Sequence, residues 1–178
     1  LNKKIKKISP FQLNIKSPPE TGKTFKSNSE LKAKYFFQKS KLITISDDSG
    51  LCIECLDGRP GIHSARWAKK LGGFQKAMSK IIQLVENKNK NKNKKNTKAE
   101  FICSLTLFIN PKKKFTALGT IQGNISSKKL GKSGFGYDPI FIPKGNKLTF
   151  GQISKRKKIF MDHRYIAFKK LKKKINIL

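Results

Sequence analysis

Acidic side chains and arginines are scarce in this 178-residue chain. Only 10 residues are Asp or Glu against 41 Lys and Arg, which gives a formal charge of +31, and only four of the basic residues are arginine. So large a positive charge favours an anionic partner such as nucleic acid, an anionic membrane or a phosphorylated ligand. Because proteins that read base edges depend on the bidentate guanidinium, the shortage of arginine argues against nucleic acid. We interpret most of the lysines as solvated surface and do not expect nucleic acid as a partner, while a functional basic surface stays as the second interpretation.

Cysteine and long apolar runs are also rare. Three cysteines do not make a disulfide framework, and the C-x-x-C spacing of Cys52 and Cys55 has no second pair that would complete a zinc site. We interpret the cysteines as small apolar side chains. No stretch approaches the ~20 continuous apolar residues of a membrane span, and no signal-peptide pattern opens the sequence. We therefore expect a soluble cytoplasmic protein without a membrane partner.

The residues that are present suffice for one folded domain. A hydrophobic fraction of 37% with 13 phenylalanines is enough for a single core over residues 1–178. Apolar spacing and capping residues predict helices over 27–38, 73–86 and 162–175. Short apolar runs predict strands over 41–46, 51–56, 100–109, 114–121 and 123–126. The Lys/Asn-rich tract at 86–98 is expected to be a mobile surface loop. This mixture indicates an α/β or α+β domain around one sheet.

Two adjacent carboxylates stand out in "SDDSG" at 46–50. Asp47 and Asp48 follow an apolar strand, and oxygen ligands of this kind suit Mg²⁺. The same residue types form turns, so a metal or catalytic site and a simple turn are equally compatible with the pattern.

Two further stretches could recognise a ligand. His163 and Arg164 follow Asp162, the expected N-cap of the last helix, where an anion or carbonyl oxygen can bind; an ordinary exposed helix start is the alternative. In "GFGYD", Phe135 and Tyr137 could stack on a planar ligand that the glycines allow to approach. A tight turn with core-filling aromatics is the alternative there.

Taken together, these stretches resemble one known family. The chain resembles the non-canonical purine nucleoside triphosphate pyrophosphatases, the inosine/xanthosine triphosphate pyrophosphatase family. The resemblance is carried by "ETGKTF" with "LKA" at 20–33, "DDSGL" and "LDGRPGIHSARWA" at 47–68, "GFGYDPIF" at 134–141, "TFG" at 149–151, and "HR" at 163–164.

The resemblance implies an α/β fold with an elongated central mixed sheet, flanking helices and two lobes around a substrate cleft, usually as a homodimer. It implies Mg²⁺-dependent hydrolysis of ITP, dITP and XTP to the monophosphate and pyrophosphate. It assigns metal binding to Glu20, Asp47 and Asp48, with Asp48 also the catalytic base. It assigns contacts with phosphate or ribose to Lys32, Ser49 and Lys158, and the base pocket to Phe135, Gly136, Tyr137, Asp138, His163 and Arg164.

The chain also departs from that family. The family opens with a strand and a T/S-x-N-x-x-K loop that grips the triphosphate, and neither has a counterpart before "LNKKIKKISPFQL". We therefore expect this domain to be N-terminally incomplete.

Overall fold

The computed structural model describes residues 6–92 and 95–176. Its helices are α1 (Phe25–Ser40), α2 (Ser64–Lys70), α3 (Phe74–Lys92), α4 (Lys155–Ile159) and α5 (His163–Asn176). Its strands are β1 (Thr44–Ile53), β2 (Lys98–Asn110), β3 (Lys113–Ile125) and β4 (Phe141–Pro143). Short 3-10 turns lie at η1 (Phe11–Leu13), η2 (Glu54–Leu56), η3 (Gly61–His63) and η4 (Asp138–Ile140). Among the described residues, no helix combines the length and the apolar character needed to cross a bilayer.

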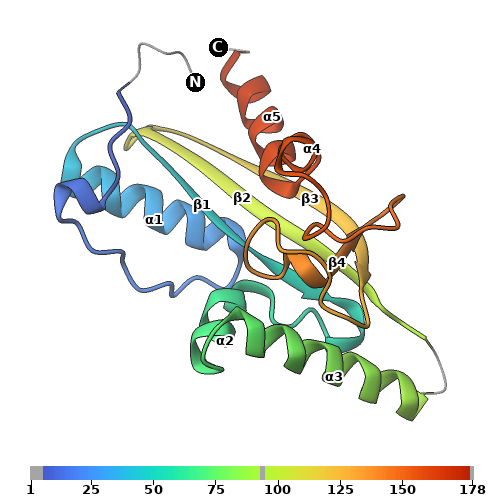
Figure 1. Ribbon diagram of the computed structural model, residues 1–178. Helices are drawn as coiled ribbons and strands as arrows, with labels where there is room; N and C mark the ends of the chain where they lie inside the picture. Colours follow the sequence, from blue (N-terminus) through green and yellow to red (C-terminus); the bar gives the residue numbers. More distant parts are fainter. Residues whose placement is uncertain (1–5, 93–94, 177–178) are drawn as a thin grey trace.

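The four strands form one sheet in the order β1-β2-β3-β4, with helices on both sides (Figure 1). The expected α/β fold with helices flanking a central sheet is confirmed. All pairings among the described strands are antiparallel, whereas a mixed sheet was expected. The reason is that consecutive strands are neighbours, and β2 and β3 are joined by a turn of only two residues, which permits antiparallel pairing alone.

β1 is one continuous strand of 10 residues at the edge of the sheet. Two short strands flanking "DDSG" were expected, and that prediction is wrong because this stretch is itself part of the strand. Asp47, Asp48 and Ser49 are instead paired with Leu105, Ser104 and Cys103 of β2. Turn-forming residues stay extended here because the ladder and side-chain partners on both faces hold them.

The two faces of β1 meet different helices, because successive side chains in a strand point to opposite sides. Ser46 donates from its hydroxyl to the Ser29 carbonyl of α1 at 2.6 Å, so this face lies against α1. The face that carries Asp47 and Ser49 meets α5 through Arg164. Adjacent carboxylates of the sequence therefore belong to opposite faces of the sheet.

The apolar core lies on the α5 side of the sheet, beneath α3. Leu51 and Ile53 of β1 pack there with buried residues of α3 and with aromatic rings from β2 and the β4 region. The phenylalanines of this core are Phe101, Phe141 and Phe150. The amphipathic spacing predicted over 73–86 is confirmed, because Ala77, Met78, Ile81 and Val85 are all buried.

The Lys/Asn-rich tract is not a loop over its first half. α3 continues to Lys92, so the prediction of a loop is wrong for residues 86–92, and β2 begins at Lys98. Residues 93–94 lie outside the described residues. Lysine, asparagine and glutamate can extend a helix whose buried face has already been anchored by Ile81 and Val85.

α5 sits directly on β3 at Gly119. A Cβ at this position would collide with the His163 carbonyl and with the backbone nitrogen of Ala167. The close approach fixes the start of α5, whose Tyr165 backbone N–H donates to Asp162 Oδ1 at 2.9 Å. Asp162 is therefore the N-cap of the last helix, as predicted.

Candidate active site

A cleft of about 240 Å³ opens around edge strand β1. Its residues come from both faces of β1, from the coil before α1, from α1, from the loop before β4 and from the start of α5. All of the predicted site residues except Lys158 line it: Glu20, Lys32, Asp47, Asp48, Ser49, Phe135, Gly136, Tyr137, Asp138, His163 and Arg164. Residues far apart in the sequence are thus brought into one cavity.

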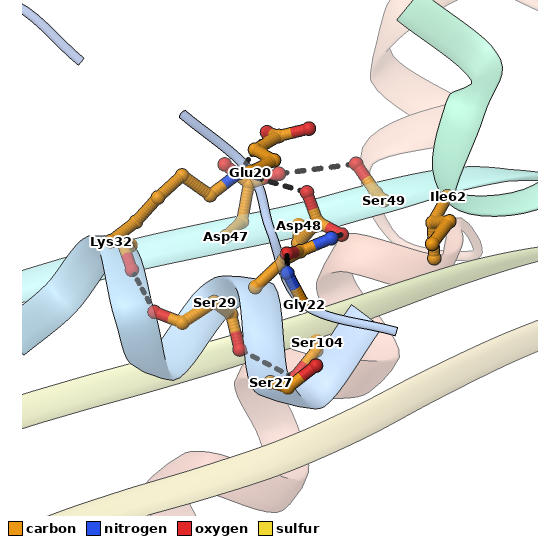
Figure 2. Close-up of polar contacts among 12 residues, drawn as sticks. Glu20, Gly22, Ser27, Ser29, Lys32, Asp47, Asp48, Ser49, Ile62 and Ser104 are labelled. Carbon is orange, nitrogen blue, oxygen red and sulfur yellow. Dashed lines mark hydrogen bonds and ion pairs between the residues drawn. The ribbon is translucent and has the colours of Figure 1, made fainter. Parts of the chain in front are cut away.

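One end of the cleft is an ammonium held between two carboxylates (Figure 2). Lys32 Nζ donates to Glu20 Oε1 at 2.9 Å and to Asp48 Oδ1 at 2.8 Å. Asp48 is 6% exposed, and its second oxygen, Oδ2, accepts from Asn28 Nδ2 at 3.3 Å. We call Glu20, Lys32 and Asp48 the carboxylate end.

Burial and charge act in opposite directions on the groups of the carboxylate end. Burial raises the pKa of Asp48, and the hydrogen bond from Lys32 offsets only part of that rise. Burial acts to lower the pKa of Lys32, but its hydrogen bonds with Asp48 and Glu20 outweigh this and raise it. Asp48 is consequently a stronger base than an exposed aspartate, beside a lysine that keeps its proton.

Asp47 is turned away from this pair. Arg164 Nη2 donates to Ser49 Oγ at 2.6 Å and lies 3.3 Å from Asp47 Oδ2. Ser49 donates to the same Asp47 oxygen at 3.2 Å. Asp47 and Ser49 therefore fix the guanidinium of α5 against β1.

His163 is buried next to this guanidinium. Its ring stacks on Phe101 at 4.8 Å between centroids, and burial followed by the nearby Arg164 and Lys158 charges lowers its pKa to about 3. Arg164 Nη1 lies 3.1 Å from His163 Nε2; since a guanidinium only donates, Nε2 accepts and the proton of the neutral ring is on Nδ1. Nδ1 is the buried side-chain polar atom that has no partner within the described part of the chain. The cleft thus contains a neutral imidazole with an unused donor.

Phe135 and Tyr137 differ in exposure and in their contacts. Phe135 is 60% exposed, whereas Tyr137 is buried, packs edge-on against Phe74 and donates from its hydroxyl to the Ser64 carbonyl at 2.9 Å. The interpretation of both rings as a stacking surface is therefore wrong for Tyr137. Its hydroxyl needs a partner when buried, and the Ser64 carbonyl supplies it.

Asp138 holds the Phe135 loop in place. Its Oδ2 accepts from Lys158 Nζ at 2.7 Å and from the backbone N–H of Phe135 at 2.8 Å. Gly134 has φ +79°, and a Cβ there would collide with the Asp138 carboxylate. Lys158 also lies 4.7 Å from the centre of the Phe135 ring, and Arg164 4.9 Å. Phe135 is thus a platform held by a buried ion pair, and we call Phe135, Asp138, Lys158 and His163 the aromatic end.

Several contributors to the cleft were not predicted from the sequence, among them Asn28, Arg66 and Phe101. Asn28 bonds to Asp48 and also accepts from the Gly22 backbone N–H at 2.8 Å. Its place four residues before Lys32 on α1, and hence on the same helix face, is a signal that could have identified it. Arg66 lies 3.9 Å from Glu20, and Phe101 lines the cleft beneath His163; no local pattern marks either of them.

Comparison with known proteins agrees with this geometry. A model of the Ham1 family matches residues 1–174. The chain belongs to the Ham1 family. This confirms the resemblance described from the sequence.

Similar proteins of the Ham1 family are known from several bacteria. A dITP/XTP pyrophosphatase of Zymomonas mobilis is 37% identical over 167 residues, spanning 94% of this chain and 78% of that protein. One from Oceanobacillus iheyensis is 38% identical over 171 residues, spanning 95% and 85%. The solved HAM1 protein of Coxiella burnetii superposes with a TM-score of 0.88 at 29% identity, covering 98% of this chain and 88% of that one. The solved Ham1 protein of Staphylococcus aureus superposes with a TM-score of 0.78 at 33% identity, covering 94% of this chain and 84% of that one.

Proposed function

We propose that this chain hydrolyses nucleoside triphosphates whose purine carries a 6-keto oxygen, namely ITP, dITP and XTP, to the monophosphate and pyrophosphate. The observation that carries the proposal is the cleft itself. It combines carboxylates and a lysine at one end with an exposed phenylalanine, a guanidinium and a neutral imidazole at the other. The relatives named dITP/XTP pyrophosphatase support this substrate class. Their names also confirm the expected enzyme class, a hydrolase acting on acid anhydrides.

The carboxylate end fits a divalent cation. Glu20 Oε1 and Asp48 Oδ1 converge on one point, where Lys32 places a positive charge. Mg²⁺ prefers such oxygen ligands and completes its shell with water and substrate phosphates. Glu20 and Asp48 would hold the ion, which when bound would neutralise phosphate charge.

Asp47 lies apart from Glu20 and Asp48 and is not placed to bind the same ion. Within residues 6–92 and 95–176, no group of three or more His, Cys, Asp or Glu side chains is arranged to hold a metal. We therefore propose Glu20 and Asp48 as the ligands, and not Asp47, which is engaged by Arg164 on the other face of β1.

Asp48 is the group suited to remove the proton of the attacking water. As the water oxygen bonds to the α-phosphorus, the bond from that phosphorus to the bridging oxygen breaks, and pyrophosphate leaves. The raised pKa of Asp48 makes it a better acceptor for this proton. Lys32, beside it, keeps its positive charge and can balance charge on the phosphates.

The aromatic end can distinguish purines by the group at position 6. Phe135 offers an exposed ring face and the partly exposed guanidinium of Arg164 is a donor that suits a keto oxygen, whereas the Nδ1–H of His163 is itself buried. Adenine presents an amino group there and would leave such donors unpaired, which weakens binding by about 1–3 kcal/mol for each buried group. The homodimer and the cytoplasmic location stay predictions from the sequence.

The test is release of pyrophosphate from ITP, dITP, XTP and ATP in the presence of Mg²⁺. We expect turnover of the three keto purines to exceed that of ATP, and Asp48→Asn to lower kcat by about 100-fold or more because the general base is lost. Asp57→Asn is the matched control, since Asp57 is exposed on a turn away from the cleft. Equal turnover of ITP and ATP, or wild-type activity in Asp48→Asn, would contradict the proposal.

A further inference from the structure

A second cavity lies on the outer side of α5, apart from the cleft. It has a volume of about 400 Å³, and its walls are Phe160, Met161, Tyr165, Ile166 and the lysines at 169, 170 and 173. We call it the α5 groove. Tyr165, Lys169 and Lys173 are spaced four residues apart, so they follow one line along the exposed side of the helix. The buried residues Ala167 and Leu171 lie on the side of α5 that faces the sheet.

The α5 groove is strongly and uniformly positive. Residues 155–176 contain ten Lys and Arg side chains and one carboxylate, Asp162, which is the N-cap of α5. Within the described residues, no carboxylate lies within ion-pair distance of Lys169, Lys170 or Lys173. Their charges are therefore available to an anionic ligand.

The groove also presents an aromatic surface. Phe160, at the C-terminal end of α4, is 67% exposed. Tyr165 meets it edge-on, with ring centroids 5.6 Å apart and planes at 86°, which steadies the Phe160 ring and leaves a face open. Lys169 Nζ lies 5.7 Å from the centre of the Tyr165 ring. Aromatic faces alternating with lysines are suited to unpaired bases and to the phosphates that join them.

We propose that the α5 groove binds single-stranded nucleic acid without regard to sequence, with a base on Phe160 and the backbone phosphates on Lys169, Lys170 and Lys173. Charge complementarity selects a polyanion, and the exposed ring selects one whose bases are unpaired. The shortage of arginine excludes reading of base edges, but this mode needs only stacking and phosphate contacts. It uses no residue of the candidate active site.

The experiment measures binding of a fluorescent dT20 oligonucleotide and of the same sequence as a duplex by anisotropy, over a range of salt concentrations. We expect tighter binding of the single strand. Phe160→Ala should weaken it about fivefold or more, since each stacked base contributes about 1–3 kcal/mol. Replacing Lys169, Lys170 and Lys173 by Gln should lower the salt slope by about 2, at about 0.7 for each phosphate contact on a single strand.

A matched control replaces the same number of exposed lysines elsewhere. Lys76, Lys80 and Lys90 lie on α3, and changing them to Gln removes equal charge without touching the groove. Circular dichroism and thermal melting confirm that each variant folds. The proposal would be overturned if the control variant lost as much affinity for the oligonucleotide as the groove variant, or if Phe160→Ala left that affinity unchanged. It would also be overturned if the protein bound vesicles of anionic lipid more tightly than the oligonucleotide and did so through the groove. None of these outcomes depends on nucleotide hydrolysis, so the two proposals fail separately.

Discussion

The two ends of the cleft each contain a lysine paired with an aspartate, yet the pairs differ in what surrounds them. Lys32 lines the cavity and bridges two carboxylates; its side chain is 15% exposed and that of Asp48 is 6% exposed. Lys158 and Asp138 have 7% and 2% exposed side chains, and Lys158 does not line the cavity. The first pair faces the cavity; the second holds the Phe135 loop.

The two pairs share their residue types but differ in access to the cavity, which Lys32 lines and Lys158 does not. A charge that has lost both water and its partner is strongly destabilising, whereas a pair at a cavity wall can be remade with water, ions or ligand. The aromatic end depends on a fixed scaffold.

The largest expected effect is at the buried pair. Asp138→Asn removes the charge 2.7 Å from Lys158 Nζ and should lower the free energy of unfolding by about 3 kcal/mol, because the buried ammonium then keeps only Asp162, at 4.0 Å. Urea denaturation at pH 7 measures it.

The same substitution at the other end is the matched comparison. Asp48→Asn should lower the free energy of unfolding by about 1 kcal/mol or less, a value ordinary for single substitutions, because Lys32 keeps Glu20 at 2.9 Å, whereas the remaining carboxylate of Lys158 lies 4.0 Å away. If both variants lose equal stability, the distinction between the two pairs is wrong.

A second effect is the loss of stability at acid pH that arises from His163. An unfolded imidazole takes up a proton near pH 6.5, but burial lowers the pKa of His163 to about 3, so the unfolded state binds more protons between these values and stability falls as pH falls. From pH 7 to pH 5 this amounts to about 2 kcal/mol.

His163→Gln should remove that part of the acid sensitivity. The difference in unfolding free energy between pH 7 and pH 5 is compared for wild type, His163→Gln and His63→Gln, the exposed histidine on η3. An unchanged slope in His163→Gln would show that the imidazole is not held neutral.

The smallest effect is expected at the platform ring. Phe135→Leu should raise the KM for ITP about tenfold through loss of stacking, with stability changed by less than about 0.5 kcal/mol because the ring is largely exposed. Phe11→Leu changes another exposed ring, on η1 and far along the chain, and should leave KM unaltered. Equal KM values for the two variants would remove Phe135 from the base site.

Most cleft residues were identified through the family resemblance, and the residue types alone marked only the stretches "SDDSG", "GFGYD" and "HR". The sequence could not place Asp47 and Asp48 on opposite faces of a strand, since the partners that hold them extended, Lys32 and Arg164, come from α1 and α5. The burial of Tyr137 could not be predicted either, because its hydroxyl bonds to a backbone carbonyl of α2, 73 residues away. Local composition misled in the same way at residues 86–92, where a helix anchored at Val85 continues through polar residues.

The register of β1 determines which of its side chains face α1 and which face α5. Because the side-chain period of a strand is two, an insertion or deletion within Thr44–Ile53 would exchange its faces. The carboxylate that meets Lys32 would then point toward α5, and the hydroxyl of Ser49 would lose its guanidinium partner. Natural variation in β1 should therefore consist of substitutions and not of insertions or deletions. Because Asp47 and Asp48 face opposite sides of the sheet, a substitution at one of them need not be accompanied by a change at the other.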